Sequence, residues 1–290
     1  MPSVVSLRQV HKNYGSHEVL KGVSFEVGPG DVVILLGPNG AGKTTTFNLM
    51  LGRQTPTSGE VRLMGQDPSR HYARKRIGVT PQESDFPKHL LVRELVGLVR
   101  SHYADPMTAD TVRDDFLLQE IWSRQAGGLS GGQRRRLGLA LAFCGNPDTI
   151  FLDEPTTGLD YLARKNLWSR VQSMAKSGKT FFLTTHYLEE AEALSTKVLV
   201  LRGGKLIYSG TADAFRKLAP FRRVRVWMPK PVRLEAASAC EPQDDHFVFY
   251  TPNSDALVKE LVRRDIEFTD LQVLPATLED ALDHVQAVQA

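Results

Sequence analysis

The stretch from Gly37 to Thr44 constrains the fold more than any other part of this chain. It reads Gly-Pro-Asn-Gly-Ala-Gly-Lys-Thr and so matches the phosphate-loop pattern G-x-x-x-x-G-K-[ST]. An apolar run at 32–36 precedes it, and helix-compatible residues follow it at 45–48. A strand, a glycine-rich loop and a helix N-terminus together turn backbone N–H groups and a helix dipole toward an anion. The stretch therefore predicts a site for a nucleoside triphosphate, the alternative being an accidental glycine-rich turn with an exposed lysine.

Two side chains of this loop have separate expected roles. Lys43 would reach the β- and γ-phosphates, and the Thr44 hydroxyl would ligate Mg²⁺. The expected nucleotide-binding residues of the loop are Gly37, Pro38, Asn39, Gly40, Ala41, Gly42, Lys43, Thr44 and Thr45.

Composition is that of an ordinary globular protein. The chain has 290 residues, of which 41% are hydrophobic and 24% charged, so it can hold one large domain and a smaller one. The net charge of +3 neither requires nor excludes a nucleic-acid partner. Two cysteines, neither in a metal-type spacing, and no signal peptide favour a reducing cytosol.

The longest run of small and apolar residues, 137–145, is shorter than the roughly 20 residues of a membrane span. We therefore expect another chain to supply any spans.

Four apolar strands are expected at 32–36, 77–80, 150–152 and 181–185, with helical segments between them. Each strand leads into polar or glycine-rich residues, which are the phosphate loop, Gln82, Asp153-Glu154 and His186. Buried apolar strands that alternate with helices indicate a parallel sheet. The carboxyl ends of such strands share the edge where α/β proteins bind ligands. We therefore expect these polar residues to meet at one edge.

Residues 129–133 read Leu-Ser-Gly-Gly-Gln and open an expected helix that runs to Cys144. Ser130 stands at the N-cap position of this helix. The motif is either a cap and a turn or a second anion site, at which a hydroxyl, backbone N–H groups and the helix dipole converge. The arginine triplet 134–136 likewise forms either a solvated helix face or part of that anion site.

Residues 4–27 alternate like antiparallel strands, with Tyr14 near the turn between them. The ring of Tyr14 either packs under the sheet edge or stacks on an adenine base. Stacking is possible because a π-face binds a base without strong discrimination.

The chain is expected to divide into two domains. Residues 1–215 would form the nucleotide-binding domain, with a mainly helical part at about 83–148. Residues 220–290 combine expected strands at 223–228 and 246–250 with helices at 255–264 and 278–288. This tail carries no catalytic constellation, and we expect a small α+β accessory domain with a regulatory or docking use.

Together the motifs resemble the ATP-binding cassette (ABC) family over residues 4–210. Six sequence features follow one another at spacings that fit within one domain. They are the phosphate loop, Gln82, Leu129–Gln133, Phe151–Pro155, Gly158-Leu159-Asp160 and His186. Leu-Ser-Gly-Gly-Gln beside a phosphate loop and an Asp-Glu pair is a specific signature, whereas many NTPases share the phosphate loop alone. The short N-terminal part, the Gly-Leu-Asp context and the C-terminal appendage are most similar to the ATPase subunits of bacterial ABC-2-type exporters. Two departures are Tyr161, where the family often has proline, and Thr149, where an aliphatic residue is usual.

The resemblance implies an α/β fold of the P-loop NTPase, ABC type. This fold has a mostly parallel core sheet, an antiparallel N-terminal β subdomain, a helical subdomain and, here, a small C-terminal α+β appendage. It also implies ATP and Mg²⁺ as cofactors, with the metal held by Thr44 and Asp153 and sensed by Gln82. Glu154 would polarise the attacking water as general base, an effect of about 10²–10⁴ in rate. His186 would contact the γ-phosphate and orient that water, and Lys43 would complete the catalytic group.

The family also implies that an intact site needs two chains, because this chain has one phosphate loop and one Leu-Ser-Gly-Gly-Gln. The ATP bound to one chain would be covered by four residues of the other chain, which are Ser130, Gly131, Gly132 and Gln133. Asp160 would also reach across to the second chain. The second chain would be another copy or a related ATPase subunit. Both would dock on an integral membrane permease at the cytoplasmic face. Residues 83–95, with Phe86, Leu90 and Leu91, are candidates for the docking groove and equally for the core of the helical subdomain.

The expected function is to energise a membrane transporter, and the subfamily likeness favours an exporter. The alternative is a soluble ABC ATPase that acts on nucleic acid or ribosomes. That class typically has paired cassettes, long coiled coils or zinc cysteines, none of which the sequence contains, so no nucleic-acid partner is expected. Leu129–Gln133 and His186 argue against a generic GTPase or kinase.

Overall fold

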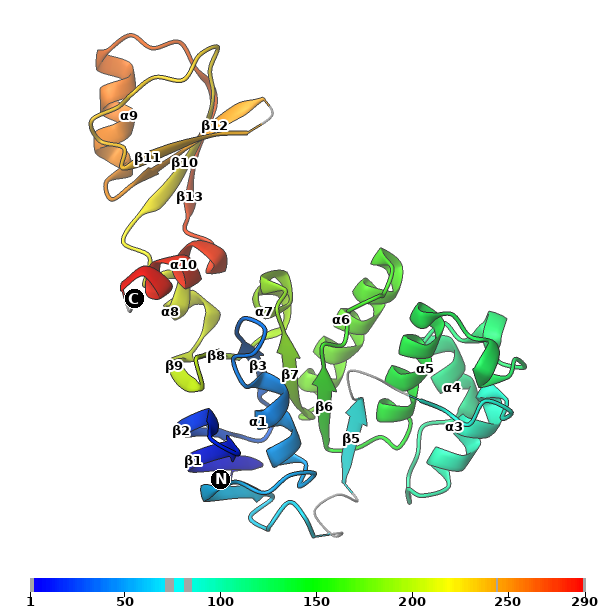
Figure 1. Ribbon diagram of the computed structural model, residues 1–290. Helices are drawn as coiled ribbons and strands as arrows, with labels where there is room; N and C mark the ends of the chain where they lie inside the picture. Colours follow the sequence, from blue (N-terminus) through cyan, green and yellow to red (C-terminus); the bar gives the residue numbers. More distant parts are fainter. Residues whose placement is uncertain (1–2, 71–75, 81–84, 244, 289–290) are drawn as a thin grey trace. The chain divides into compact units, whose positions relative to one another are not determined.

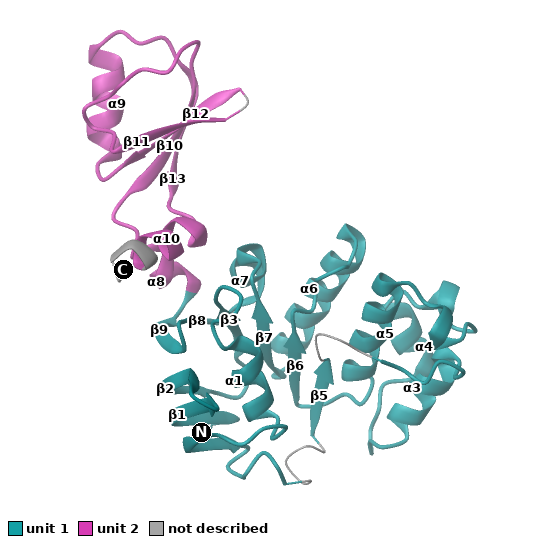
Figure 2. Cartoon of the chain, viewed as in Figure 1, with its two compact units in different colours: residues 1–211 teal, residues 212–290 magenta. Residues whose placement is uncertain are grey.

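The computed structural model describes residues 3–70, 76–80, 85–243 and 245–288. The chain divides into two compact units, 1–211 and 212–290, which are coloured separately in Figure 2. Helix α8 (Ala212–Arg216) groups with the second unit, so the division falls slightly before the residue 215 expected from sequence. In these described stretches, no helix is both long and apolar enough to cross a membrane.

The core of the first unit is a six-stranded sheet with the order β5-β6-β7-β3-β8-β9 (Figure 1). Its strands are β3 (Val32–Leu36), β5 (Ile77–Thr80), β6 (Thr149–Asp153), β7 (Thr180–Thr185), β8 (Lys197–Arg202) and β9 (Lys205–Gly210). All neighbours pair in parallel except β9, which returns antiparallel to β8. Every residue of β3, β6 and β7 is buried, as expected for strands covered on both faces. The expected mostly parallel core sheet is confirmed.

A three-stranded antiparallel sheet with the order β2-β1-β4 completes the N-terminal part of this unit. Its strands are β1 (Val5–Tyr14), β2 (His17–Val27) and β4 (Ser58–Leu63). Inward residues of this sheet, such as Leu7 and Leu20, share one apolar cluster with Val33 of β3 and Phe47 of α1 (Lys43–Met50). This common core fixes the strand before the phosphate loop and the helix after it.

Helices of the first unit follow the pattern expected for residues 83–148, with one difference. Helices α3 (Val92–Arg100), α4 (Ala109–Asp115) and α5 (Gly131–Phe143) and the 3₁₀ turns η1 (Gln119–Ile121) and η2 (Ala126–Gly128) lie beside the β5 edge (Figure 1). The difference is a break after α4, which ends at Asp115 because Leu117 has a φ of 53° and cannot continue the helix. Helices α6 (Tyr161–Lys176) and α7 (Leu188–Leu194) connect the remaining strands.

The second unit is an α+β fold around a four-stranded antiparallel sheet with the order β11-β12-β10-β13. Its elements are β10 (Arg222–Trp227), β11 (Ala239–Gln243), β12 (His246–Thr251), α9 (Ser254–Arg263), β13 (Thr269–Pro275) and α10 (Leu278–Val288). Alternate residues of β10 and β12, among them Val224 and Phe249, pack with Leu257 and Leu261 of α9 in a separate core. Strands β11 and β13 were not expected from sequence.

Candidate functional site

The phosphate loop leaves β3 and enters α1 in a shape that requires glycine. A Cβ atom on Gly37 would lie 2.3 Å from the carbonyl oxygen of Leu201, and Gly40 and Gly42 have φ of 79° and 106°. Gly42 precedes the first helical residue in this left-handed conformation, which side chains rarely adopt. The loop therefore turns tightly and leaves the N-terminal N–H groups of α1 without helical partners.

Lys43 is folded back into the loop that it follows. Its Nζ donates hydrogen bonds to the carbonyl oxygens of Gly37 at 2.6 Å and Pro38 at 3.3 Å. Its side chain is 7% exposed, and Nζ lies 3.8 Å from Oε1 of Glu154. The ammonium group is thus held where the loop surrounds it, opposite a carboxylate.

Beside the loop lies a cavity of about 330 Å³, a size in the range of small-ligand sites. The residues that line it are His17, Val19, Pro38, Asn39, Gly40, Gly42, Lys43, Thr44, Thr45 and Glu154. His17 and Val19 of β2 were not singled out in the sequence, because nothing near them marks a ligand site. Gly37 contributes its carbonyl to Lys43 instead of lining the cavity, and Ala41 is buried beneath the loop.

Asp153 is the last residue of β6 and Glu154 follows it, and both are fixed by the neighbouring strand β7. The Thr184 hydroxyl donates to Oδ1 of Asp153, and the Glu154 N–H donates to the carbonyl oxygen of Thr184 at 3.1 Å. Asp153 is 3% exposed and Glu154 is 7% exposed. Glu154 has a φ of 49°, an unusual value for a residue with a side chain. The two carboxylates are therefore buried and held by different contacts.

His186 meets Glu154 from the end of β7. Its Nδ1–H donates to Oε2 of Glu154 at 2.7 Å, while the imidazole remains 47% exposed. A carboxylate can only accept, so this contact fixes the proton on Nδ1 and leaves Nε2 for another partner. Lys43, Glu154 and His186 thus come together at the carboxyl edge of the sheet, as the strand pattern predicted.

Burial dominates the electrostatics of the site. It lowers the pKa of Lys43, and the charges of Glu154 and Asp153 partly oppose that shift. Burial also raises the pKa of Asp153, against the hydrogen bond from Thr184. The carboxyl of Glu190 on α7 is 1% exposed, and burial raises its pKa as well. Buried charges of both signs compensate one another, and an incoming polyphosphate or cation would change that balance strongly.

The Leu-Ser-Gly-Gly-Gln segment begins α5 with a reciprocal cap. Ser130 Oγ accepts from the Gln133 N–H at 3.3 Å, and Gln133 Oε1 accepts from the Ser130 N–H at 3.0 Å. Ser130 and Gly131 are exposed, and a Cβ atom on Gly132 would lie 3.1 Å from the carbonyl oxygen of Gly158. Within the described part of the chain, no residue of 129–133 lines the phosphate-loop cavity. One chain therefore does not bring the two motifs into a single cavity.

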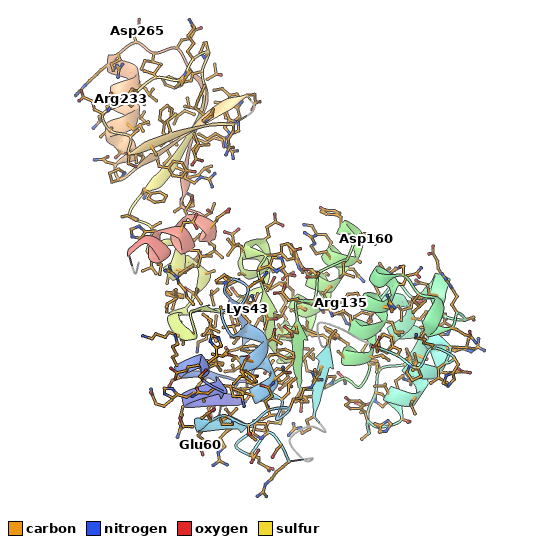
Figure 3. All side chains as sticks on the ribbon, in the orientation of Figure 1. Lys43, Glu60, Arg135, Asp160, Arg233 and Asp265 are labelled. Carbon is orange, nitrogen blue, oxygen red and sulfur yellow. The ribbon has the colours of Figure 1, made fainter. Side chains whose placement is uncertain are left out.

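The arginine triplet does not form one face. Arg134 is exposed, whereas Arg136 donates to the carbonyl oxygen of Leu117 at 2.9 Å. Arg135 is 8% exposed and donates to backbone carbonyls at 153–155; Figure 3 labels it together with Lys43. A solvated face therefore describes Arg134 alone.

Two further predicted residues, Asp160 and Tyr14, do not line this cavity. Asp160, labelled at the start of α6 in Figure 3, accepts the Ala163 N–H at 2.8 Å and so caps that helix. Tyr14 is 47% exposed and its hydroxyl donates to Gln54 at 2.6 Å, so its ring is not packed under the sheet. Gln82 lies outside the described residues.

Similarity to known proteins was found for both units. A family model described as ABC transporter matches residues 20–157. Nod factor export ATP-binding protein I of Burkholderia pseudomallei (strain K96243) is 38% identical over 296 residues, which cover 95% of this chain and 94% of the relative. The protein of that name from Burkholderia orbicola is 42% identical over 219 residues, 72% of this chain and 71% of the relative.

Solved structures of ABC proteins also resemble this chain. A structure described as the ATP binding subunit of an ABC transporter has a TM-score of 0.69 and 26% identity, over 74% of this chain and 92% of its own. A bacterial Atm1-family ABC exporter with ATP bound has a TM-score of 0.65 and 26% identity, over 73% of this chain and 40% of its own.

Proposed function

Since the chain belongs to the ABC transporter family as an ATP-binding, ATP-hydrolysing subunit, we propose that two such chains share each ATP site and that their closure drives an export permease. The observation that supports the shared site is the separation of the two phosphate-binding motifs within one chain. The residues that line the phosphate-loop cavity come from β2, the loop, the start of α1 and Glu154, and none comes from the start of α5 in the described part of the chain. Ser130 caps α5 and Gly131 is its first residue, and both are exposed on the same unit.

The exposed start of α5 suits a triphosphate presented by another molecule. N-terminal N–H groups and the helix dipole attract an anion, and the glycines leave them uncovered. A second chain turned by a two-fold axis would offer its phosphate loop to Ser130, Gly131, Gly132 and Gln133, and would receive the same in return. Asp160 caps α6 with one carboxylate oxygen, and its other oxygen would face the second chain. The second chain is another copy or a related ATPase subunit.

The chain's own side chains divide the hydrolysis between them. On entry of ATP, Lys43 would exchange its contacts with Gly37 and Pro38 for the β- and γ-phosphates. Glu154 would accept a hydrogen bond from the attacking water and take its proton, because it is a buried carboxylate beside the cavity. His186 would hold Glu154 through Nδ1–H and offer Nε2 to the γ-phosphate or the water. Tyr14 has an exposed ring with which to stack on adenine.

Thr44 and Asp153 fit a magnesium site. Thr44 is an exposed residue that lines the cavity, and Asp153 is a buried carboxylate whose charge a cation would stabilise. Gln82, which lies outside the described residues, stays the expected sensor of the metal and the γ-phosphate. When bound, Mg²⁺ would neutralise charge on the β- and γ-phosphate oxygens.

The partner in the membrane is a permease, and the transport direction is export. The names of both Burkholderia relatives include the word export. The alignment with the relative from Burkholderia pseudomallei covers 95% of this chain and therefore includes residues of both units. Phe86, Leu90 and Leu91 are only partly buried, so part of each residue faces solvent. They therefore favour the docking groove over the core of the helical subdomain. The two chains would bind the permease at the cytoplasmic face of the membrane.

Turnover as a function of protein concentration tests the shared site. We expect the ATPase rate per chain to rise with concentration and then to level off, because only paired chains contain complete sites. The measurement is phosphate release at saturating ATP over a wide dilution series of the purified chain. A rate per chain that stays constant down to the most dilute samples would argue for a site complete in one chain.

A further inference from the structure

A buried arginine joins α5 to the backbone that carries Glu154. Arg135 lies on α5, the helix that Ser130 caps, and its side chain is nearly inaccessible to solvent. Its Nη2 donates to the carbonyl oxygen of Glu154 at 2.6 Å and also to that of Asp153. Its Nε donates to the carbonyl oxygen of Pro155 at 3.2 Å. One guanidinium thus binds three consecutive carbonyl groups.

These three carbonyls surround the strained position of the segment. Glu154 has a φ of 49°, and a residue with a side chain keeps such a left-handed conformation only where its surroundings fix it. Three carbonyl dipoles that converge on one buried point repel one another in the absence of a donor. The planar fork of arginine satisfies several acceptors at once, which the single ammonium of lysine does less well.

From these contacts we infer that Arg135 is a positioning residue for hydrolysis. It keeps Glu154 in the left-handed conformation from which the carboxylate reaches His186 and faces Lys43. It also ties that conformation to α5, whose N-terminus would contact the ATP of the second chain. This inference rests on the proposed role of Glu154 as the group that polarises water.

The neighbouring arginines supply a matched comparison. Arg136 lies on the same helix and also donates to a backbone carbonyl, but that carbonyl belongs to Leu117 on the connection after α4. Loss of this contact would weaken the helix packing without reaching Glu154. The effect of Arg135 on hydrolysis can therefore be separated from a general loss of stability.

The experiment compares Arg135→Met, Arg135→Lys and Arg136→Gln in the full chain, with ATP hydrolysis normalised to the number of ATP-binding sites in each sample. We expect kcat per site to fall at least about tenfold for Arg135→Met, with the Kd for ATP within about twofold of the unmodified chain. Arg135→Lys should recover part of the lost rate, because it keeps the charge and one or two donors. Arg136→Gln should lower the melting temperature while kcat per site stays within about threefold.

A double-mutant cycle with Glu154→Gln separates the two proposals. If Arg135 acts through Glu154, adding Arg135→Met to Glu154→Gln should change the residual rate by less than about twofold. An unchanged kcat per site in Arg135→Met, or a full further loss in the double variant, would overturn the positioning role alone. Wild-type turnover in Glu154→Gln would instead overturn the proposed function of Glu154.

Discussion

Glu154→Gln should retain ATP binding and lose hydrolysis by about 10²–10⁴-fold, the usual effect of removing a general base. Glutamine has nearly the same size and still accepts the hydrogen bond from His186 Nδ1, so the local packing survives. It has no basic oxygen to take the proton of water. Because ATP is then bound without being split, the closed pair of chains should accumulate.

Single-turnover hydrolysis and sedimentation in ATP and in ADP measure both effects. A suitable control is Glu60→Gln on β4, which removes an exposed carboxylate that pairs with Arg62 and is labelled in Figure 3. It should hydrolyse ATP normally. Rapid turnover in Glu154→Gln would refute the assignment of the base, and a one-chain mass in saturating ATP would refute the accumulation of pairs.

Lys43→Ala should lose ATP affinity rather than the chemical step alone. Hydrogen bonds to a charged group contribute about 1.5–3 kcal/mol, so we expect the Kd for ATP to rise by about 10- to 100-fold. The lysine is buried in the loop and opposes Glu154, and its loss would leave that carboxylate without its nearby cation. An anionic triphosphate would then enter a site with one positive charge fewer.

Titration calorimetry with ATP measures this affinity directly. Lys179→Ala is a matched control, since Lys179 is half-buried and donates to the carbonyl oxygen of Asn146 at 3.0 Å, away from the phosphate loop. It should lower stability and leave the Kd unchanged. Tight ATP binding by a folded Lys43→Ala variant would contradict the phosphate role of the lysine.

Local sequence patterns were enough to predict most strands and helix starts of the nucleotide-binding unit. The apolar runs at 32–36 and 181–185 are long, uninterrupted and followed by polar residues, and both are fully buried strands with the expected bounds to within one residue. The phosphate loop needed glycine at fixed positions, and its glycines adopt the conformations that require it. The helix after Ser130 carried its own capping signal, which the structure contains.

Features that depend on distant residues were not predictable in this way. Arg135 stands in a triplet that reads as one polar run, and only the packing of α5 against β6 separates it from Arg134 and Arg136. His17 lines the cavity because β2 passes beside the loop, although no local motif marks it. Strand β11 contains Pro242 and is exposed throughout, so it lacks the alternation that identifies a strand in sequence.

Subunit complementation tests the shared site most directly. One variant, Lys43→Ala, loses the phosphate-loop half of a site, and another, Ser130→Arg, blocks the half at the start of α5. Each should be nearly inactive alone. In an equal mixture, half of the pairs would combine the two variants and contain one intact site, so about a quarter of the wild-type rate should return. If the mixture shows only the sum of the two residual rates although mixed pairs form, each chain works alone and the account is wrong.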